Sequence, residues 1–198
     1  DTAYSTVRVH PDPAIDFSRS VNTGCGPLSV NFTSSVLNAQ DYFWDFGNGG
    51  TGTGVNPSRA YTMNPNADTT YNVMLVASNH YSCRDTAYGT VTLFPYPTAI
   101  ISTTDTAGCT PFNISLTHNA VLGSEYLWVF GNGSTDTAQN TNTVLTNNSA
   151  FDTLYYPKLI VTSNRGCIDS IEQEIRVWPL PTVDFTSALD NVCSNLEV

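Results

Sequence analysis

The chain has 198 residues, of which only 12% are charged, and acidic residues outnumber basic ones by 17 to 7. A net charge of −10 with a single lysine, Lys158, argues against a nucleic-acid or anionic lipid partner, because both are bound through clustered Lys and Arg. Hydrophobic residues at 40% suffice for a packed core, and the absence of a run of 18 apolar residues argues against a membrane-spanning helix.

The local pattern is that of β-strands. Apolar and polar residues alternate with a period of two in the segments 27–32, 71–75 and 90–94, and Gly, Pro, Asn and Asp cluster between them as in turns. No segment carries the apolar stripe of a three-turn helix. Several short strands with regular turn signals are typical of a Greek-key β-sandwich of the immunoglobulin type. We therefore predict an all-β chain in which Trp44 and Trp128 are buried core residues.

The sequence repeats itself with a step of 84 residues. Asp1–Pro13 returns as 85–97 and again as 169–181, and the same step carries Trp44 to Trp128. Such self-similarity is the signature of a repeat architecture. We infer two complete units. The predicted division is a last strand of a preceding unit in 1–13, complete units in 14–97 and 98–181, and the first strand of a following unit in 182–198. These boundaries predict an excerpt from a longer array.

Several segments together resemble a known family. Tyr42-Phe-Trp-Asp-Phe-Gly-Asn-Gly49, with Tyr71-Asn-Val-Met-Leu75 and Cys83-Arg-Asp85, is similar to the polycystic kidney disease (PKD) repeat, whose hallmark is a Trp-Asp-Phe-Gly-Asp-Gly strand and turn. The resemblance implies tandem PKD-type sandwiches arranged end to end, without catalytic activity of their own. The chain departs from this pattern at Asn48, and at Val129 in the second unit. Both departures argue against a cation at the turn.

Five cysteines in a β-sandwich array indicate an oxidising compartment. Because each unit holds two, we predict the disulfides Cys25–Cys83 and Cys109–Cys167, and we assign the remaining Cys193 to a following unit. Each predicted disulfide would close a loop of 58 residues. In the chain-entropy account, such a bond stabilises its unit by about 4 kcal/mol. A bond between Cys83 and Cys109 across the unit boundary is the alternative. A redox or metal site is disfavoured, because the chain has no Cys-x-x-Cys and no His at a repeating position.

Each unit ends in a ring that is followed by Pro-x-Pro, at His10, Phe94 and Trp178. Paired prolines hold the backbone extended, so these junctions predict stiff links and an elongated rod of units. Two roles are open for the ring. It packs against the loops of the next unit, or it caps the core of its own unit.

No candidate active site emerges from the sequence. His10, His80 and His118 occupy unrelated positions in the repeat, and neither a Gly-x-Ser-x-Gly nor a His-Glu-x-x-His motif occurs. Asp41 and Asp45 are a close acidic pair on a predicted strand, which a turn or a solvated edge explains better than glycoside hydrolysis does. We therefore expect no enzyme activity, no cofactor and no metal.

Asp followed by Thr or Ser and then Ala, Ile, Leu or Thr recurs more often than the composition predicts. The tripeptide resembles the O-glycosylation signal of exported proteins in the large group of Gram-negative bacteria that includes gliding species. The sugar-bearing candidates are Thr2, Thr69, Thr86, Thr106, Thr137, Thr153 and Ser170. Glycans would hydrate a surface that carries few charged side chains. The alternative is that Asp-Thr only opens strands and turns.

These observations favour a non-catalytic structural and adhesive segment of a long bacterial cell-surface or filament protein, similar to the large adhesins of gliding bacteria. The expected partners are neighbouring repeats of the same chain and surface polysaccharide or like filaments, without nucleic acid and without membrane insertion. The alternative is a spacer or weak polysaccharide-binding region of a secreted degradative enzyme. A third hypothesis is carbohydrate binding by exposed aromatic side chains at Tyr42, Tyr88, Tyr96 and Trp178.

Overall fold

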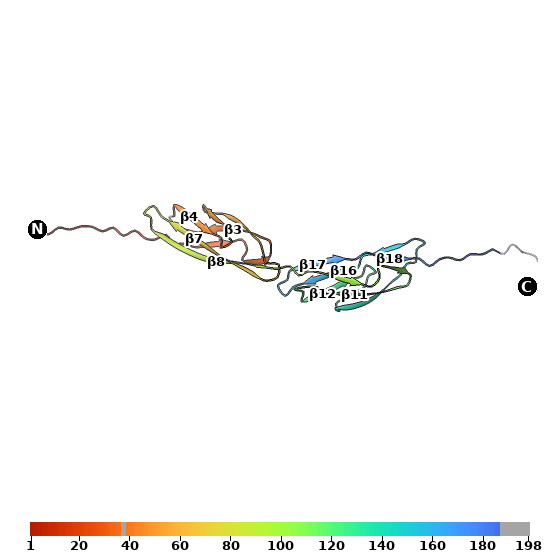
Figure 1. Cartoon of the computed structure of the whole chain (residues 1–198). Helices are drawn as coiled ribbons and strands as arrows, with labels where there is room; N and C mark the ends of the chain where they lie inside the picture. The colour runs from red at the N-terminus through yellow and green to blue at the C-terminus, as the bar shows by residue number, and fades with distance from the viewer. Residues whose placement is uncertain (37–38, 187–198) are drawn as a thin grey trace, which may run out of the picture. The chain divides into compact units, whose positions relative to one another are not determined.

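The computed structural model describes residues 1–36 and 39–186 of the chain (Figure 1). All regular secondary structure in these ranges is β-strand, which confirms the predicted all-β class. Over the same ranges there is no helix of the length and apolarity that crossing a bilayer requires. Cys193 and most of 182–198, predicted as the first strand of a following unit, lie outside the described residues.

The first repeat forms a sandwich of two sheets, as expected for an immunoglobulin-like domain. The smaller sheet has the order β1 (Phe17–Arg19), β3 (Leu28–Ser34) and β6 (Ser58–Tyr61). The larger sheet has the order β2 (Thr23–Cys25), β8 (Arg84–Phe94), β7 (Thr69–Ser78), β4 (Asp41–Asp45) and β5 (Thr51–Thr53). Neighbouring strands are antiparallel except β2 and β8, which run parallel.

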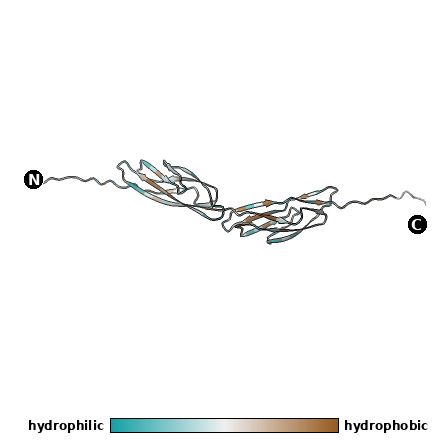
Figure 2. Cartoon of the chain, viewed as in Figure 1, coloured by the Kyte–Doolittle hydropathy of each residue, from teal (hydrophilic) through white to brown (hydrophobic). Residues whose placement is uncertain are grey.

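The core of the first sandwich lies between these two sheets, and Figure 2 shows hydrophobic residues along the strands. Trp44 on β4 is fully buried, as predicted, and its ring makes a T-shaped contact with that of Phe17, with the centroids 5.1 Å apart. The indole Nε1 of Trp44 donates a hydrogen bond of 2.9 Å to the Gly54 carbonyl, so the ring is buried with its donor paired. Each buried apolar side chain contributes about 1.5 to 3 kcal/mol relative to exposure. The other members of this core are Val30, Phe32, Phe46, Tyr61, Val73, Leu75, Val91 and Leu93.

The second repeat forms the same type of sandwich from strands that lie one step further along the chain. One sheet contains β9 (Ile101–Thr103), β11 (Phe112–His118) and β14 (Asn140–Leu145). The other strands form two sheets, β13 (Thr135–Asp136) with β12 (Glu125–Val129), β16 (Lys158–Thr162) and β17 (Ile168–Glu172), and β10 (Ala107–Cys109) with β18 (Ile175–Trp178) and β15 (Thr153–Tyr155). Trp128 is fully buried, again as predicted, and its Nε1 donates a 3.0 Å bond to Ala138, the equivalent of Gly54.

Pro157 explains why this second layer is divided where the first repeat has one continuous sheet. Pro157 occupies the position of Val73, which lies within β7 and pairs with Gly89 on β8. Proline has no N–H to offer the ladder, so regular pairing stops on either side of it. At this break, the amide of Gln173 donates a hydrogen bond of 2.9 Å to the carbonyl of Pro157. Strands β15 and β16 are therefore the two halves of one strand, and so are β17 and β18.

The chain divides into two compact units. The first comprises residues 1–99 with the segments 120–126 and 160–170, and the second comprises 100–119, 127–159 and, of the described residues, 171–186. The first unit thus contains two segments whose sequence belongs to the second repeat. Asp1–Pro13 form no strand, so their assignment to a preceding repeat stays a prediction.

Candidate functional site

One disulfide joins two of the described cysteines, Cys25 and Cys167, whose Cα atoms are 5.7 Å apart. The predicted pairs Cys25–Cys83 and Cys109–Cys167 are therefore wrong. Cys83 and Cys109 carry free thiols, so the alternative bond between these two is not formed either. Because the bonded cysteines stand 142 residues apart in a sequence with an 84-residue period, the disulfide connects a residue of the first repeat to a residue of the second.

The length of β8 explains why Cys25 does not pair with Cys83. Cys25 lies opposite Phe94 at the end of β8, whereas Cys83 directly precedes Arg84 at its beginning. The 11 residues of β8 rise by about 3.3 Å each, which separates the two cysteines by roughly 35 Å. A disulfide requires Cα atoms within about 7 Å of each other. The strand register thus excludes the pairing that the sequence spacing favoured.

The second repeat has the same arrangement. Cys109 lies opposite Trp178 at the end of β18, while Cys167 directly precedes Ile168 at the beginning of β17. Because β17 and β18 are the two halves of one strand, these cysteines also lie at its opposite ends. The pairing of Cys109 with Cys167 fails for the same geometric reason.

Cys167 is held in place by the tight loop 163–167. The amide of Ser163 donates to the carbonyl of Cys167 at 2.8 Å, and the amide of Cys167 donates to Ser163 Oγ at 3.1 Å. Gly166 closes the loop with a φ of 78°, in the left-handed region that glycine enters without a Cβ penalty. Cys167 is almost fully buried. Its sulfur is therefore positioned by the loop for the bond to Cys25.

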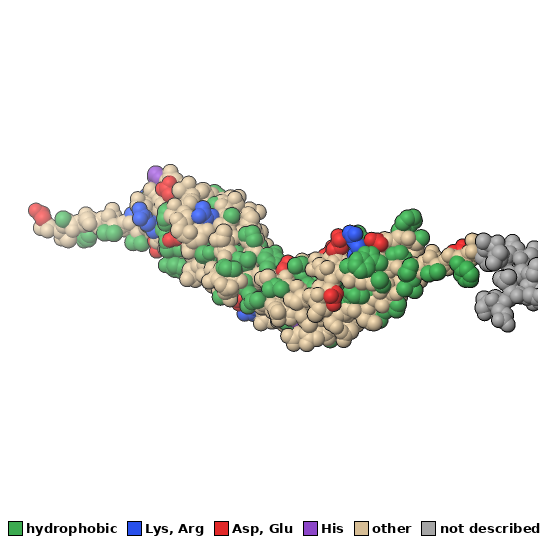
Figure 3. Space-filling view, turned by 45° about the vertical axis from the view of Figure 1, so that its right-hand side comes forward, with side chains coloured by type: hydrophobic (Ala, Val, Ile, Leu, Met, Phe, Trp, Pro, Cys, Tyr) green, Lys and Arg blue, Asp and Glu red, His purple; other side chains and the backbone are tan. Residues whose placement is uncertain are grey.

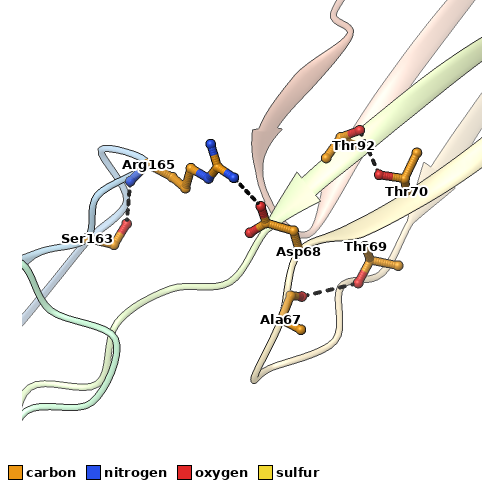
Figure 4. Close-up of polar contacts among 7 residues, drawn as sticks. All are labelled: Ala67, Asp68, Thr69, Thr70, Thr92, Ser163 and Arg165. Atoms are coloured by element: carbon orange, nitrogen blue, oxygen red, sulfur yellow. Dashed lines mark hydrogen bonds and ion pairs between the residues drawn. The ribbon is translucent and has the colours of Figure 1, made fainter.

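Arg165 ties this loop to other parts of the first compact unit. Its guanidinium forms an ion pair with Asp68, with 2.7 Å between Nη2 and Oδ2 (Figure 4), and lies 5.0 Å from the centroid of the Phe94 ring. Both charged side chains are partly exposed, so the ion pair contributes at most about 1 kcal/mol. The contact with the ring adds a similar amount, about 0.5 to 1 kcal/mol. A pocket of about 360 Å³ lies beside the pair, lined in part by residues 66–68, 122–124 and 163–165.

The loop 79–83 of the first repeat matches the loop 163–167. The amide of Asn79 donates to the carbonyl of Cys83 at 3.0 Å, as Ser163 does to Cys167. The imidazole of His10 stacks on the ring of Tyr81 in this loop, with an angle of 8° between the ring planes. The side-chain amide of Asn79 also donates to the Pro11 carbonyl at 2.9 Å.

Through the 84-residue step, His10 and Tyr81 are equivalent to Phe94 and Arg165. In both pairs, the ring that precedes Pro-x-Pro contacts the residue two places before the cysteine of a loop. Of the two roles left open for this ring, packing against a loop is the one found at His10 and Phe94. The third such ring, Trp178, is 42% exposed.

The Phe-Gly-Asn-Gly turn is closed by its own side chains. The carboxylate of Asp45 accepts a 2.8 Å bond from the Gly47 amide. Asn48 accepts from the Gly50 amide at 3.2 Å, and its side-chain NH₂ donates to the Ala60 carbonyl at 3.1 Å. An aspartate at 48 has no proton with which to make the second bond. Among the described residues, no group of three or more His, Cys, Asp or Glu side chains is placed to hold a metal ion.

The titratable residues singled out by the sequence do not converge. Asp41 and Asp45 lie at the two ends of β4, and Asp41 accepts a weak 3.4 Å bond from Ser78. His10 stacks on Tyr81, whereas His118 is buried in the second repeat near Trp128, where burial lowers the pKa of its imidazole. Among the residues that the structure describes, these carboxylates and imidazoles do not place a general acid and a general base together.

The seven candidate glycosylation hydroxyls divide by exposure. Thr2, Thr106, Thr137 and Ser170 are exposed, and Thr69, Thr86 and Thr153 are half-buried. The face in Figure 3 shows sparse charged side chains among mostly uncharged ones. The aspartate that precedes Thr137 has a local structural role. Asp136 accepts bonds from the Thr141 hydroxyl and from the amides of Ala138 and Thr137, and these bonds lower the pKa of its carboxyl.

The aromatic side chains proposed for carbohydrate binding differ in accessibility. Tyr88 is 75% exposed on β8, and Tyr96 and Trp178 are partly exposed. Tyr42 is half-buried, packed against the core of the first sandwich. A stacking platform for sugars that includes Tyr42 is therefore disfavoured.

The family model of the PKD domain matches residues 8–93. Among solved structures, the PKD1 domain of the Vibrio cholerae metalloprotease PrtV is 29% identical, with a TM-score of 0.36 over 42% of this chain and 98% of that one. The PKD1 domain of Vibrio anguillarum Epp is 24% identical, with a TM-score of 0.37 over 43% of this chain and 96% of that one. A 1.5-MDa bacterial ice-binding adhesin is 10% identical, with a TM-score of 0.38 over 86% of this chain and 66% of that one. A search of the curated proteins finds no match.

The matched residues 8–93 contain the Trp-Asp-Phe-Gly strand and turn on which the resemblance was based, together with the first β-sandwich. The resemblance to a PKD domain is thereby confirmed for residues 8–93, which match the family model.

Proposed function

We propose that this chain is a non-catalytic structural segment of a tandem PKD array, which is exported and displayed at a bacterial cell surface or in a filament. The observation that carries the proposal is the Cys25–Cys167 disulfide. In an array, a covalent bond between successive repeats would carry tension from one repeat to the next. Tension on the two ends of the chain is transmitted through this bond. The residues between the two cysteines are thereby shielded from extension.

Three further observations support a structural role. The two repeats bury equivalent Trp side chains and pair their indole donors with equivalent carbonyls. Tyr61 is fully buried in the core of the first sandwich, and this burial raises the pKa of its hydroxyl to about 12. The ring contacts of His10 and Phe94 recur from one loop to the next.

Single-molecule stretching of the whole chain between its ends tests the proposal. In the oxidised chain the 142-residue step between the cysteines cannot extend, so only the flanking segments lengthen. After reduction, unfolding should release roughly 500 Å of additional contour, at about 3.6 Å per residue. A matched Cys83→Ser variant should behave like the unchanged chain, whereas Cys167→Ser should extend without reductant. Full extension of the oxidised chain would contradict the proposal.

We further propose that the exposed Asp-Thr and Asp-Ser hydroxyls carry O-linked sugars in an exported protein of the gliding-bacterium type. The accessibility of Thr2, Thr106, Thr137 and Ser170 supports these four sites more than the half-buried ones. Intact-mass measurement on the native protein tests this. A mass equal to that of the bare chain would end the argument for glycosylation.

The alternative function is a spacer or weak polysaccharide binder beside the catalytic domain of a secreted degradative enzyme. The two functions predict different sequence around these residues in the intact protein. Further 84-residue periods favour the array, and a catalytic domain favours the enzyme. For surface polysaccharide as a partner, a glycan array probed with the whole chain gives the answer, with Tyr88→Ala as the matched control.

A further inference from the structure

We propose that Cys83 and Cys109 are the two open positions of a disulfide ladder, each of which repeats the Cys25–Cys167 bond with a further PKD repeat. This inference rests on the proposed function as a tandem array. Cys109 is one 84-residue step after Cys25, and Cys83 is one step before Cys167. Each free thiol is therefore the repeat equivalent of a cysteine that is bonded in this structure.

The surroundings of Cys109 reproduce those of Cys25. Cys25 lies opposite Phe94 in the parallel pairing of β2 with β8, and Cys109 lies opposite Trp178 in the parallel pairing of β10 with β18. The residue after each cysteine donates its amide to the carbonyl of the opposite ring residue, at 3.1 Å in the first repeat and 3.0 Å in the second. Cys109 is exposed, so its thiol is accessible.

The surroundings of Cys83 reproduce those of Cys167. Both end a loop with the same backbone hydrogen bond, and in both loops the residue two places earlier contacts the ring that precedes Pro-x-Pro. For Cys83 that contact is already made, because His10 stacks on Tyr81 in the position that Phe94 takes beneath Arg165. The Cys83 thiol lies 4.0 Å from the His10 carbonyl. The two sites differ in that Cys167 is bonded to Cys25, whereas Cys83 carries a free thiol.

The chemistry is a two-electron oxidation. Two thiols lose two protons and two electrons and form one S–S bond, while a small-molecule or protein disulfide accepts the electrons and is reduced to two thiols. An oxidising compartment, as the cysteine content indicates, supplies such a disulfide. No metal or other cofactor takes part in this exchange.

The ladder has a mechanical consequence that disulfides within single units lack. Successive bonds of this type overlap, since the loop closed by Cys25–Cys167 already contains Cys109, where the next bond begins. A segment of one repeat therefore cannot be pulled out without breaking a bond to its neighbour. Isolated bonds within each unit would leave the stretch from Cys83 to Cys109 free to extend.

A lengthened chain tests the inference. A second copy of residues 98–181 is inserted between Pro181 and Thr182, the protein is refolded with oxidised glutathione, and disulfides are mapped by mass spectrometry after thiol alkylation. The expected result is a bond between Cys109 and the copy of Cys167, with loss of alkylation at Cys109. Cys83→Ser should leave this bond intact, and replacing the copied Cys167 by Ser should restore full alkylation of Cys109.

Two results would overturn the inference in distinguishable ways. If the inserted copy folds, as judged by the near-ultraviolet signal of its Trp128, while Cys109 is alkylated as in the original chain, the ladder is wrong and the tandem array stands. A bond between Cys83 and Cys109 in that folded protein would likewise show that the ladder is wrong. If the inserted copy does not fold, the tandem array fails and the ladder fails with it.

Discussion

Cys25 and Phe94 occupy paired positions on the parallel strands β2 and β8, so that a sulfur and an aromatic ring are presented side by side. Both then meet the same loop, the sulfur through its bond to Cys167 and the ring through Arg165. A covalent and a non-covalent contact thus connect the same two segments of the first compact unit. The covalent contact dominates, since the cation–π contact is worth about 1 kcal/mol.

Replacing Cys167 by Ser should destabilise the protein strongly. The closed loop spans 142 residues, and the chain-entropy account assigns about 5 kcal/mol to a loop of that length. Urea unfolding followed by Trp fluorescence measures the loss. Cys83→Ser, which removes a free thiol from the equivalent loop, is the matched control and should change the unfolding free energy by about 0.5 kcal/mol or less. Equal losses in the two variants would contradict the observed pairing.

In the second repeat, truncation of a buried leucine should destabilise the protein more than truncation of an exposed leucine. Leu159 on β16 is fully buried, whereas Leu154 on β15 is 40% exposed. Leu159→Ala should cost about 2 to 5 kcal/mol through lost burial and the cavity that remains. Leu154→Ala should cost much less, and thermal unfolding of the two variants checks the difference. Similar melting temperatures would mean that the second sandwich does not pack as described.

The two Asn residues of the repeated turn should respond differently to aspartate. Asn48 and Asn132 both donate their side-chain NH₂ to a strand carbonyl at 3.1 Å, a bond that a carboxylate cannot make. Asn48 is also bonded to Arg59, which would pair with the new charge, whereas Asn132 has Thr143 at that place. Asn132→Asp should therefore cost about 1 to 3 kcal/mol, and Asn48→Asp distinctly less. The reverse order, measured by chemical denaturation, would contradict this account of the turn.

Stability should fall as the pH drops below the ordinary pKa of histidine, because of His118. Burial lowers the pKa of its imidazole in the folded chain, so below about 6.5 the unfolded state binds more protons than the folded state. Unfolding by urea at pH 7.5 and at pH 5.5 measures the loss. His118→Leu removes the titrating group and should flatten the profile in this window. An unchanged slope in the variant would assign the pH dependence to other groups.

The fold was predictable because its signals are local. Alternation in 27–32 and 71–75 marks strands, and a Trp among apolar neighbours marks the core at Trp44. The break at Pro157 is also a local signal, since proline cannot donate within a ladder. Comparison of this position with Val73 could have located the division of β15 from β16 before the structure was known.

The disulfide was not predictable in the same way. Its geometry depends on the parallel pairing of β2 with the end of β8, which no local pattern encodes. Spacing alone favours the nearest cysteines within a unit, and that choice ignores the length of the strand that separates Cys25 from Cys83. The ring contacts of His10 and Phe94 depend on the same non-local arrangement, which is why the sequence left their role open between two alternatives.

Disulfide mapping of the unmodified chain tests the account most directly. After alkylation of free thiols without reduction and proteolysis, mass spectrometry should find one peptide that joins Cys25 to Cys167, with Cys83 and Cys109 alkylated. Peptides that join Cys25 to Cys83 and Cys109 to Cys167 would contradict it, because each disulfide would then lie within a single repeat.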